Sequence, residues 1–105
     1  MSNVRRRQED MRVSITQLVA LGQLPSELGA SAPKIEEFEH LIQQIEAPLT
    51  KAEALALLSV FGQDDCFGLA WSLLHLVETA PGWPYPEANL RAANPWVKRM
   101  LERAK

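Results

Sequence analysis

Cys66 is the first residue to consider for chemistry, because a thiolate is a strong nucleophile. It is the one cysteine in the sequence, and it lies near the start of an expected helix, where the helix dipole lowers the pKa of a thiol. Asp64 and Asp65 directly precede it, and their negative charge acts in the opposite direction. His75 follows nine residues later, about 13 Å along the helix and on its other side. We therefore expect a buried structural cysteine and no catalytic dyad.

His75 and Glu78 place an imidazole and a carboxylate on adjacent turns of one expected helix, as do Glu36 and His40 on another. Two such helices could hold a divalent ion between them. Glu36 and His40 lie on the polar face of their helix, so we expect no metal site and no cofactor. His75 and Glu78 stay a candidate ligand pocket beside Trp83. The alternatives are an interhelical hydrogen bond for His75 and an ion pair between Glu78 and an arginine of the last helix.

The sequence lacks the common catalytic motifs. It has no glycine-rich phosphate loop, no Gly-x-Ser-x-Gly elbow, no paired-histidine zinc motif and no dinucleotide fingerprint. We therefore predict no catalytic residues and a protein that is not an enzyme.

The first half of the chain predicts two amphipathic helices. Apolar residues at helical spacing indicate a helix over about 3–21, which Gly22 ends. A loop rich in proline, glycine and serine follows. Pro33 suits the first turn of the second helix, which ends before Pro48 and has an acidic polar face.

The centre of the chain predicts a helical hairpin. Thr50 and Glu53 form a capping box that begins a helix over 50–61. Asp64 or Asp65 is expected to cap the next helix, at 64–79, whose apolar residues cover roughly 220° of its circumference. Such a helix belongs at the buried centre. Together the two helices resemble a hairpin of the HEAT or armadillo type; no second copy recurs at a fixed period, so we predict no solenoid.

The C-terminal part begins with three prolines between Pro81 and Pro86, which favour an extended path. A short helical turn over 87–93 and a helix capped by Asn94 follow, with Pro95 at its first position. No segment alternates with period two. The prediction is therefore all-α: a compact bundle of four to five short antiparallel helices, with the hairpin at about 50–79 as its buried centre.

Composition agrees with one small domain over residues 1–105. The chain is 47% apolar and 23% charged, with a net charge of −2. No apolar run is long enough to span a membrane, and the N-terminus lacks the apolar stretch of a secretory signal. We therefore expect a cytoplasmic protein with no membrane partner.

The charges are unevenly distributed along the chain. Residues 13–90 hold ten carboxylates against two lysines, whereas residues 91–105 hold five basic side chains against one glutamate. The basic ends could attract nucleic acid, but the helix at 64–79 has no side chain suited to reading base edges. We therefore do not expect a nucleic-acid partner.

Binding of another protein is the function that these observations favour. Acidic residues could steer a basic partner, and two aromatic residues on a stiff segment could anchor it. These predicted contact residues are Glu36, Glu37, Glu39, Asp64, Asp65, Trp83 and Tyr85. The specific form we favour is an immunity-like or antitoxin-like inhibitor of a basic effector. The alternatives are a homodimeric structural or adaptor module, and a small enzyme or ligand-binding domain that uses His75 and Glu78.

Overall fold

The structure is a computed structural model that describes residues 11–104. These residues contain helices and no strand, so the all-α prediction is confirmed. In chain order the helices are α2 (Val13–Leu21), α3 (Ala32–Gln43), α4 (Lys51–Leu57), the 3₁₀ helix η1 (Leu58–Val60), α5 (Leu69–Glu78), the 3₁₀ helix η2 (Pro86–Arg91) and α6 (Pro95–Arg103).

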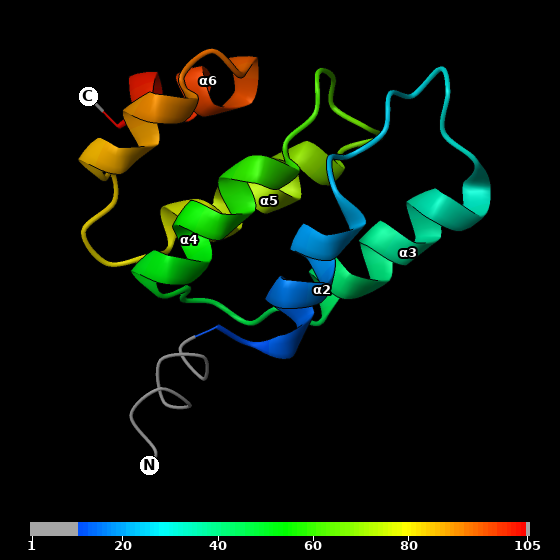
Figure 1. The fold of residues 1–105 in the computed structure, drawn as a ribbon, viewed down its shortest axis with the longest axis horizontal. Coiled ribbons are helices and arrows are strands. Elements are labelled where there is room, and N and C mark those ends of the chain that lie inside the picture. The colour runs from blue at the N-terminus through cyan, green and yellow to red at the C-terminus, as the bar shows by residue number, and fades with distance from the viewer. Residues whose placement is uncertain (1–10, 105) are drawn as a thin grey trace.

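Helices α4 and α5 form the predicted central hairpin. The chain rises through α4 and returns antiparallel through α5, with α3 on one side of the pair and α6 on the other (Figure 1). Leu73 and Leu74 on α5 are both fully buried. The buried apolar residues of all the helices form one core around this pair.

Both helices of the hairpin are shorter than predicted. The α-helix that begins at Lys51 ends at Leu57 and continues as 3₁₀ turns to Val60. The next helix begins at Leu69, not at Asp64, so the predicted capping of α5 by Asp64 or Asp65 is wrong. The Asp64 carboxylate instead accepts hydrogen bonds within the loop before α5, as described below.

Within the described residues, the helix predicted over 3–21 begins only at Val13, after Arg12. The backbone at Arg12 is extended, with φ −67° and ψ 156°, and α2 begins at the next residue. Residues 3–10 lie outside the described part of the chain. The backbone N–H of Arg12 donates to Glu53 Oε2 at 3.0 Å and not to a helical carbonyl oxygen.

Arg12 joins α2 to α4 through the buried side chain of Glu53. The guanidinium donates to Glu53 from Nε at 2.9 Å and from Nη2 at 2.9 Å. It also donates to the carbonyl oxygens of Glu46 at 2.7 Å and Pro48 at 3.1 Å. Glu53 completes the predicted capping box with Thr50. We call this set of contacts the Arg12–Glu53 node.

The charge of Glu53 is held in the folded protein mainly by the hydrogen bonds from Arg12. The Glu53 side chain is only 1% exposed, and burial alone would favour its neutral form. The hydrogen bonds from the Arg12 side chain outweigh burial and lower the pKa of Glu53 from 4.5 to about 2. The backbone N–H groups of Thr50 and Arg12 add to this effect.

Helices α3 and α6 begin with local side-chain caps. Ser31 accepts from the backbone of Lys34 at 3.4 Å and caps α3. Asn94 caps α6 as predicted, accepting from the backbone of Trp96 at 2.8 Å. Its amide also donates to the carbonyl oxygen of Phe61 at 3.0 Å, which ties α6 to the loop after η1.

Truncation of the central helix should be costly. Leu73→Ala and Leu74→Ala each leave a cavity in the core, and each should lower the free energy of unfolding by about 2–5 kcal/mol. Leu28→Ala serves as the control, because Leu28 is fully exposed; it should change stability by no more than about 0.5 kcal/mol. Urea unfolding of the three variants measures this. A near-neutral result at Leu73 would contradict the central placement of α5.

The Arg12–Glu53 node should make the free energy of unfolding depend on pH at acidic pH. Because folding lowers the pKa of Glu53 to about 2, its contribution is present above about pH 4.5 and is lost as the pH falls towards 2. This contribution is on the order of 3 kcal/mol. Urea unfolding at stepped pH should therefore show the difference between wild type and Glu53→Gln shrinking as the pH falls.

Glu87→Gln is the matched control for this experiment. Glu87 also pairs with a cation, Lys51, at 3.0 Å, but both side chains are about half exposed, at 51% and 53%. Water screens this pair, so its removal should give a much smaller dependence on pH. A difference between wild type and Glu53→Gln that stays constant from pH 7 to pH 2 would contradict the role of the node.

Candidate functional site

Two loops far apart in sequence are hydrogen-bonded to each other. The backbone N–H of Glu27 donates to Asp64 Oδ2 at 3.1 Å, and the backbone N–H of Phe67 donates to Glu27 Oε2 at 2.8 Å. The backbone of Leu24 also donates to Val60, at 2.8 Å. We call residues 23–31 and 61–68 the paired loops. They lie side by side near the start of α3 (Figure 1).

Gly62 allows the close approach of the two loops. A Cβ atom at this position would clash with the backbone carbonyl of Leu24. Gln23 adds a further link, since its side-chain amide donates to the carbonyl oxygen of Phe61 at 3.1 Å. The loops therefore support each other through backbone contacts, and neither needs a regular element of its own.

The backbone before α5 is strained. Cys66, Phe67 and Gly68 are consecutive left-handed residues, with φ of 49°, 56° and 90°. This conformation costs a residue with a side chain roughly 1–2 kcal/mol. Asp64 supports the turn, because its Oδ1 atom accepts from the backbone of Cys66 at 3.0 Å. Strain of this kind persists only where the surroundings impose it, and it is concentrated at functional positions.

The strained turn buries one side chain and exposes the next. Cys66 is fully buried, whereas the Phe67 ring is 63% exposed. Phe67, Ile35 and Glu36 line a shallow groove of about 370 Å³, together with two alanines. Leu28, at the tip of the other loop, is 100% exposed. We call Phe67 and Ile35, which line this groove, the apolar tip.

Unpaired carboxylates gather on α3, in the segment after it and on the paired loops. Apart from Glu102 on α6, the carboxylates of residues 11–104 that form no ion pair belong to α3, to the segment directly after it, or to the paired loops. They are Glu27, Glu36, Glu37, Glu39, Glu46, Asp64 and Asp65. Lys34, which lies 5.8 Å from the ring of Phe38, is the only cation of α3 and the paired loops. The surface around the tip is therefore acidic.

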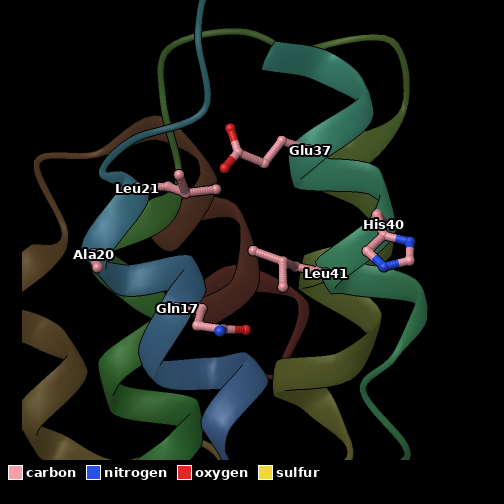
Figure 2. Close-up of a pocket in the computed structure, with 6 residues that line it drawn as sticks. All are labelled: Gln17, Ala20, Leu21, Glu37, His40 and Leu41. Carbon is pink, nitrogen blue, oxygen red and sulfur yellow. The ribbon is translucent and has the colours of Figure 1, made fainter. Parts of the chain in front are cut away.

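The predicted acidic face of α3 divides into two sides. Glu36 lines the groove beside Phe67. Glu37, one residue further on, lines a different groove of about 380 Å³ between α2 and α3. Figure 2 shows the Glu37 carboxylate directed towards Leu21 in this second groove, while the His40 ring points away from α2. Glu36 and Glu37 therefore lie on different sides of α3, and only Glu36 lines the groove beside Phe67.

The groove between α2 and α3 offers little chemistry. Its sides are formed largely by Ala20, Leu21 and Leu41, with Gln17 and Glu37 as its inward polar groups (Figure 2). The nearby His40 is held at its ring by the Gln44 side chain, at 2.8 Å. A single carboxylate without a partner base or a second ligand does not form an active site.

The predicted aromatic anchors belong mainly to the fold. Tyr85 is buried, and its hydroxyl donates to the carbonyl oxygen of Pro81. Trp83 is half-buried and meets the Tyr85 ring edge-on at 5.6 Å. Gly82 has φ 86°, and a Cβ there would come within 3.2 Å of the Tyr85 ring. The segment closes the core and leaves Tyr85 no exposed face to anchor a partner.

His75 and Glu78 do not converge on one pocket. His75 is exposed beside Trp71, at 6.0 Å between ring centroids, and lines a groove between α3 and α5. Glu78 does not line that groove; its carboxylate binds Arg103 at 2.9 and 3.2 Å. The expected ion pair of Glu78 with the last helix is therefore confirmed. The interhelical hydrogen bond expected of His75 is not present among residues 11–104.

Cys66 lacks the environment of a nucleophile. Burial raises the pKa of its thiol, and the negative charges of Asp64, Glu27 and Asp65 raise it further. The prediction of a buried cysteine is confirmed. Within residues 11–104, no three histidine, cysteine, aspartate or glutamate side chains are grouped as metal ligands would be. None of the helices in this range has the length and apolar character needed to cross a bilayer.

Comparison with known proteins adds no assignment. No family model, no curated protein and no solved structure matches this chain. The site is therefore defined by its own geometry.

The apolar tip is the feature that the sequence did not predict. Phe67 falls within the helix expected at 64–79, whose apolar residues place it at the buried centre. A signal was present, because Asp64 can close a turn onto the residue two positions on as readily as it can cap a helix. Gly68 then marks the left-handed position where the turn ends.

Phe67→Gly tests whether Phe67 stabilises the core or only adds backbone strain. Glycine adopts φ near 56° without steric cost, and little burial is lost from a ring that is 63% exposed. The free energy of unfolding should stay unchanged or rise by up to about 1 kcal/mol. Phe61→Ala, at a fully buried ring of the same loop, should instead cost about 3–5 kcal/mol. A loss above about 2 kcal/mol for Phe67→Gly in urea unfolding would mean that the ring belongs to the core.

Proposed function

We propose that this chain is a non-catalytic module that binds a basic partner protein through the apolar tip and the carboxylates around it. The observation that carries the proposal is the ring of Phe67, exposed on a backbone in the left-handed region. An exposed phenylalanine on a strained turn costs stability and contributes little to the core. We therefore assign the exposed ring to a contact with another molecule.

The tip has the properties of a binding hot spot. Its aromatic ring is carried by a loop that is already ordered by contacts with Glu27 and Asp64, so binding loses little conformational entropy. Ile35 supplies apolar area beside it in the same groove. Hot spots combine a central anchor of this kind with a surrounding polar rim.

The carboxylates favour a partner of opposite charge. Glu36 lines the groove beside Phe67, and Glu27, Asp64 and Asp65 belong to the paired loops. Such a rim raises the rate of association with a basic protein and disfavours acidic ones. The form of partner we propose is a basic effector such as a nuclease, which an immunity-like or antitoxin-like inhibitor would neutralise by covering its nucleic-acid surface.

Affinity capture followed by titration tests this proposal. The tagged full chain and its Phe67→Gly variant are used in parallel on lysate of the organism that encodes it. The expected partner is a basic protein that wild type retains at physiological salt, that high salt releases, and that Phe67→Gly does not retain. With the purified partner, Phe67→Gly should weaken binding by about 30-fold or more, which is the effect of losing a hot-spot residue.

Two charge reversals on α3 give the matched control. Glu36→Lys alters the groove beside Phe67, and Glu37→Lys makes the same charge change in the groove towards α2. Glu36→Lys should weaken binding clearly more than Glu37→Lys. Equal retention of the same proteins by wild type and Phe67→Gly would refute the site. Recovery of a second copy of the chain alone would replace the proposal with self-association.

A further inference from the structure

A second surface lies on α6, away from the apolar tip. The guanidinium carbon of Arg99 is 4.8 Å from the ring centroid of Trp96 and 5.4 Å from that of Trp71. The two rings meet edge-on, with centroids 5.2 Å apart and an angle of 86°. Cation–π contacts with both rings therefore hold the Arg99 side chain in place on the surface.

Arg103, one turn further along α6, contacts the same aromatic cluster and also binds a carboxylate. It also lies over the Trp71 ring, at 5.9 Å. Its Nε and Nη2 atoms donate to the two carboxylate oxygens of Glu78, at 2.9 and 3.2 Å. Arg103 thus combines a ring contact with a bidentate carboxylate contact.

Arg99 has the ring contacts but no carboxylate. It is exposed, and within residues 11–104 it forms no ion pair and no side-chain hydrogen bond. A guanidinium carries five N–H donors, and contacts with aromatic rings do not use them as hydrogen-bond donors to a carboxylate. The side chain is therefore ordered in advance with its donors unused.

We propose that Arg99 binds a carboxylate of an acidic protein segment, in the bidentate manner of Arg103 with Glu78. The rings of Trp71 and Trp96 fix the guanidinium, so the ligand does not have to order a long side chain. Exposed Lys98 beside it adds attraction for an acidic segment. This site lies on α6 and does not depend on the function proposed for the apolar tip.

The same contacts disfavour nucleic acid at this surface. Single strands bind through bases stacked on open aromatic faces. Two arginines already lie over the Trp71 ring, and Trp96 is buried. The carboxylate of Glu78 also adds negative charge beside the cations. A protein carboxylate, which brings one charge in a planar group, fits this environment better than a chain of phosphates.

The test titrates the full chain with an N-acetylated hexaglutamate peptide at low salt. Nitrogen-labelled protein gives a separate NMR signal for the Nε–H of each arginine. The signal of Arg99 should shift and saturate with peptide, while that of Arg103, already bonded to Glu78, should move little. Fluorescence of the tryptophans beside Arg99 gives the dissociation constant.

Two variants separate a bidentate site from general charge attraction. Arg99→Lys keeps the charge but loses the planar fork, and should weaken binding at least about tenfold. Lys98→Ala removes an exposed charge from the same helix and should change binding by no more than about threefold. Circular dichroism confirms that each variant is folded.

Several results would overturn the proposal. One is an Arg99 signal in the wild-type protein that the peptide does not move, a measurement that holds even if Arg99→Lys fails to fold. Another is equal weakening by Arg99→Lys and Lys98→Ala, which would indicate attraction without a defined site. A third is tighter binding of a ten-nucleotide thymidine strand than of hexaglutamate at the same salt, which would assign the surface to nucleic acid.

Discussion

The contact between Arg12 and Glu53 is the constraint on which the arrangement of the first half of the chain depends. The Arg12 guanidinium binds Glu53, the partner of Thr50 in the capping box of α4, and also the carbonyl oxygens of Glu46 and Pro48. The start of α2 and the segment after α3 are therefore held at one point. Because a buried carboxylate is costly without its partner, this geometry is strongly favoured over alternatives.

The paired loops hold an unfavourable backbone conformation without regular secondary structure. Asp64 uses both carboxylate oxygens, one for the turn at Cys66 and one for the backbone of Glu27. Glu27 returns a bond to the backbone of Phe67. The strain at Phe67 is therefore offset by hydrogen bonds between two loops, each of which would lose its conformation without the other. These hydrogen bonds between the two loops keep the Phe67 ring exposed.

Features set by neighbouring residues were predictable from the sequence, and features set by distant ones were not. The capping box of Thr50 and the Asn94 cap depend on contacts within three residues, and both are confirmed. Asp64 has the same local options of helix cap or turn, and Glu27, 37 residues away, decides between them. The partner of Arg12 likewise lies 41 residues further along the chain, which no local pattern indicates. The exposure of Phe67 follows from these same long-range contacts.

Charge counted along the sequence also differs from charge presented at the surface. Of the carboxylates in residues 13–90, Glu53, Glu78 and Glu87 are in ion pairs with cations from other segments. Those left unpaired gather on α3 and the paired loops, while α6 retains the unpaired cations Lys98 and Arg99. Figure 1 places α3 and α6 on opposite sides of the central hairpin. The acidic surface is positioned by hydrogen bonds between loops and the basic one by contacts with aromatic rings, and the two are joined where Asn94, which caps α6, donates to the carbonyl oxygen of Phe61 in the paired loops.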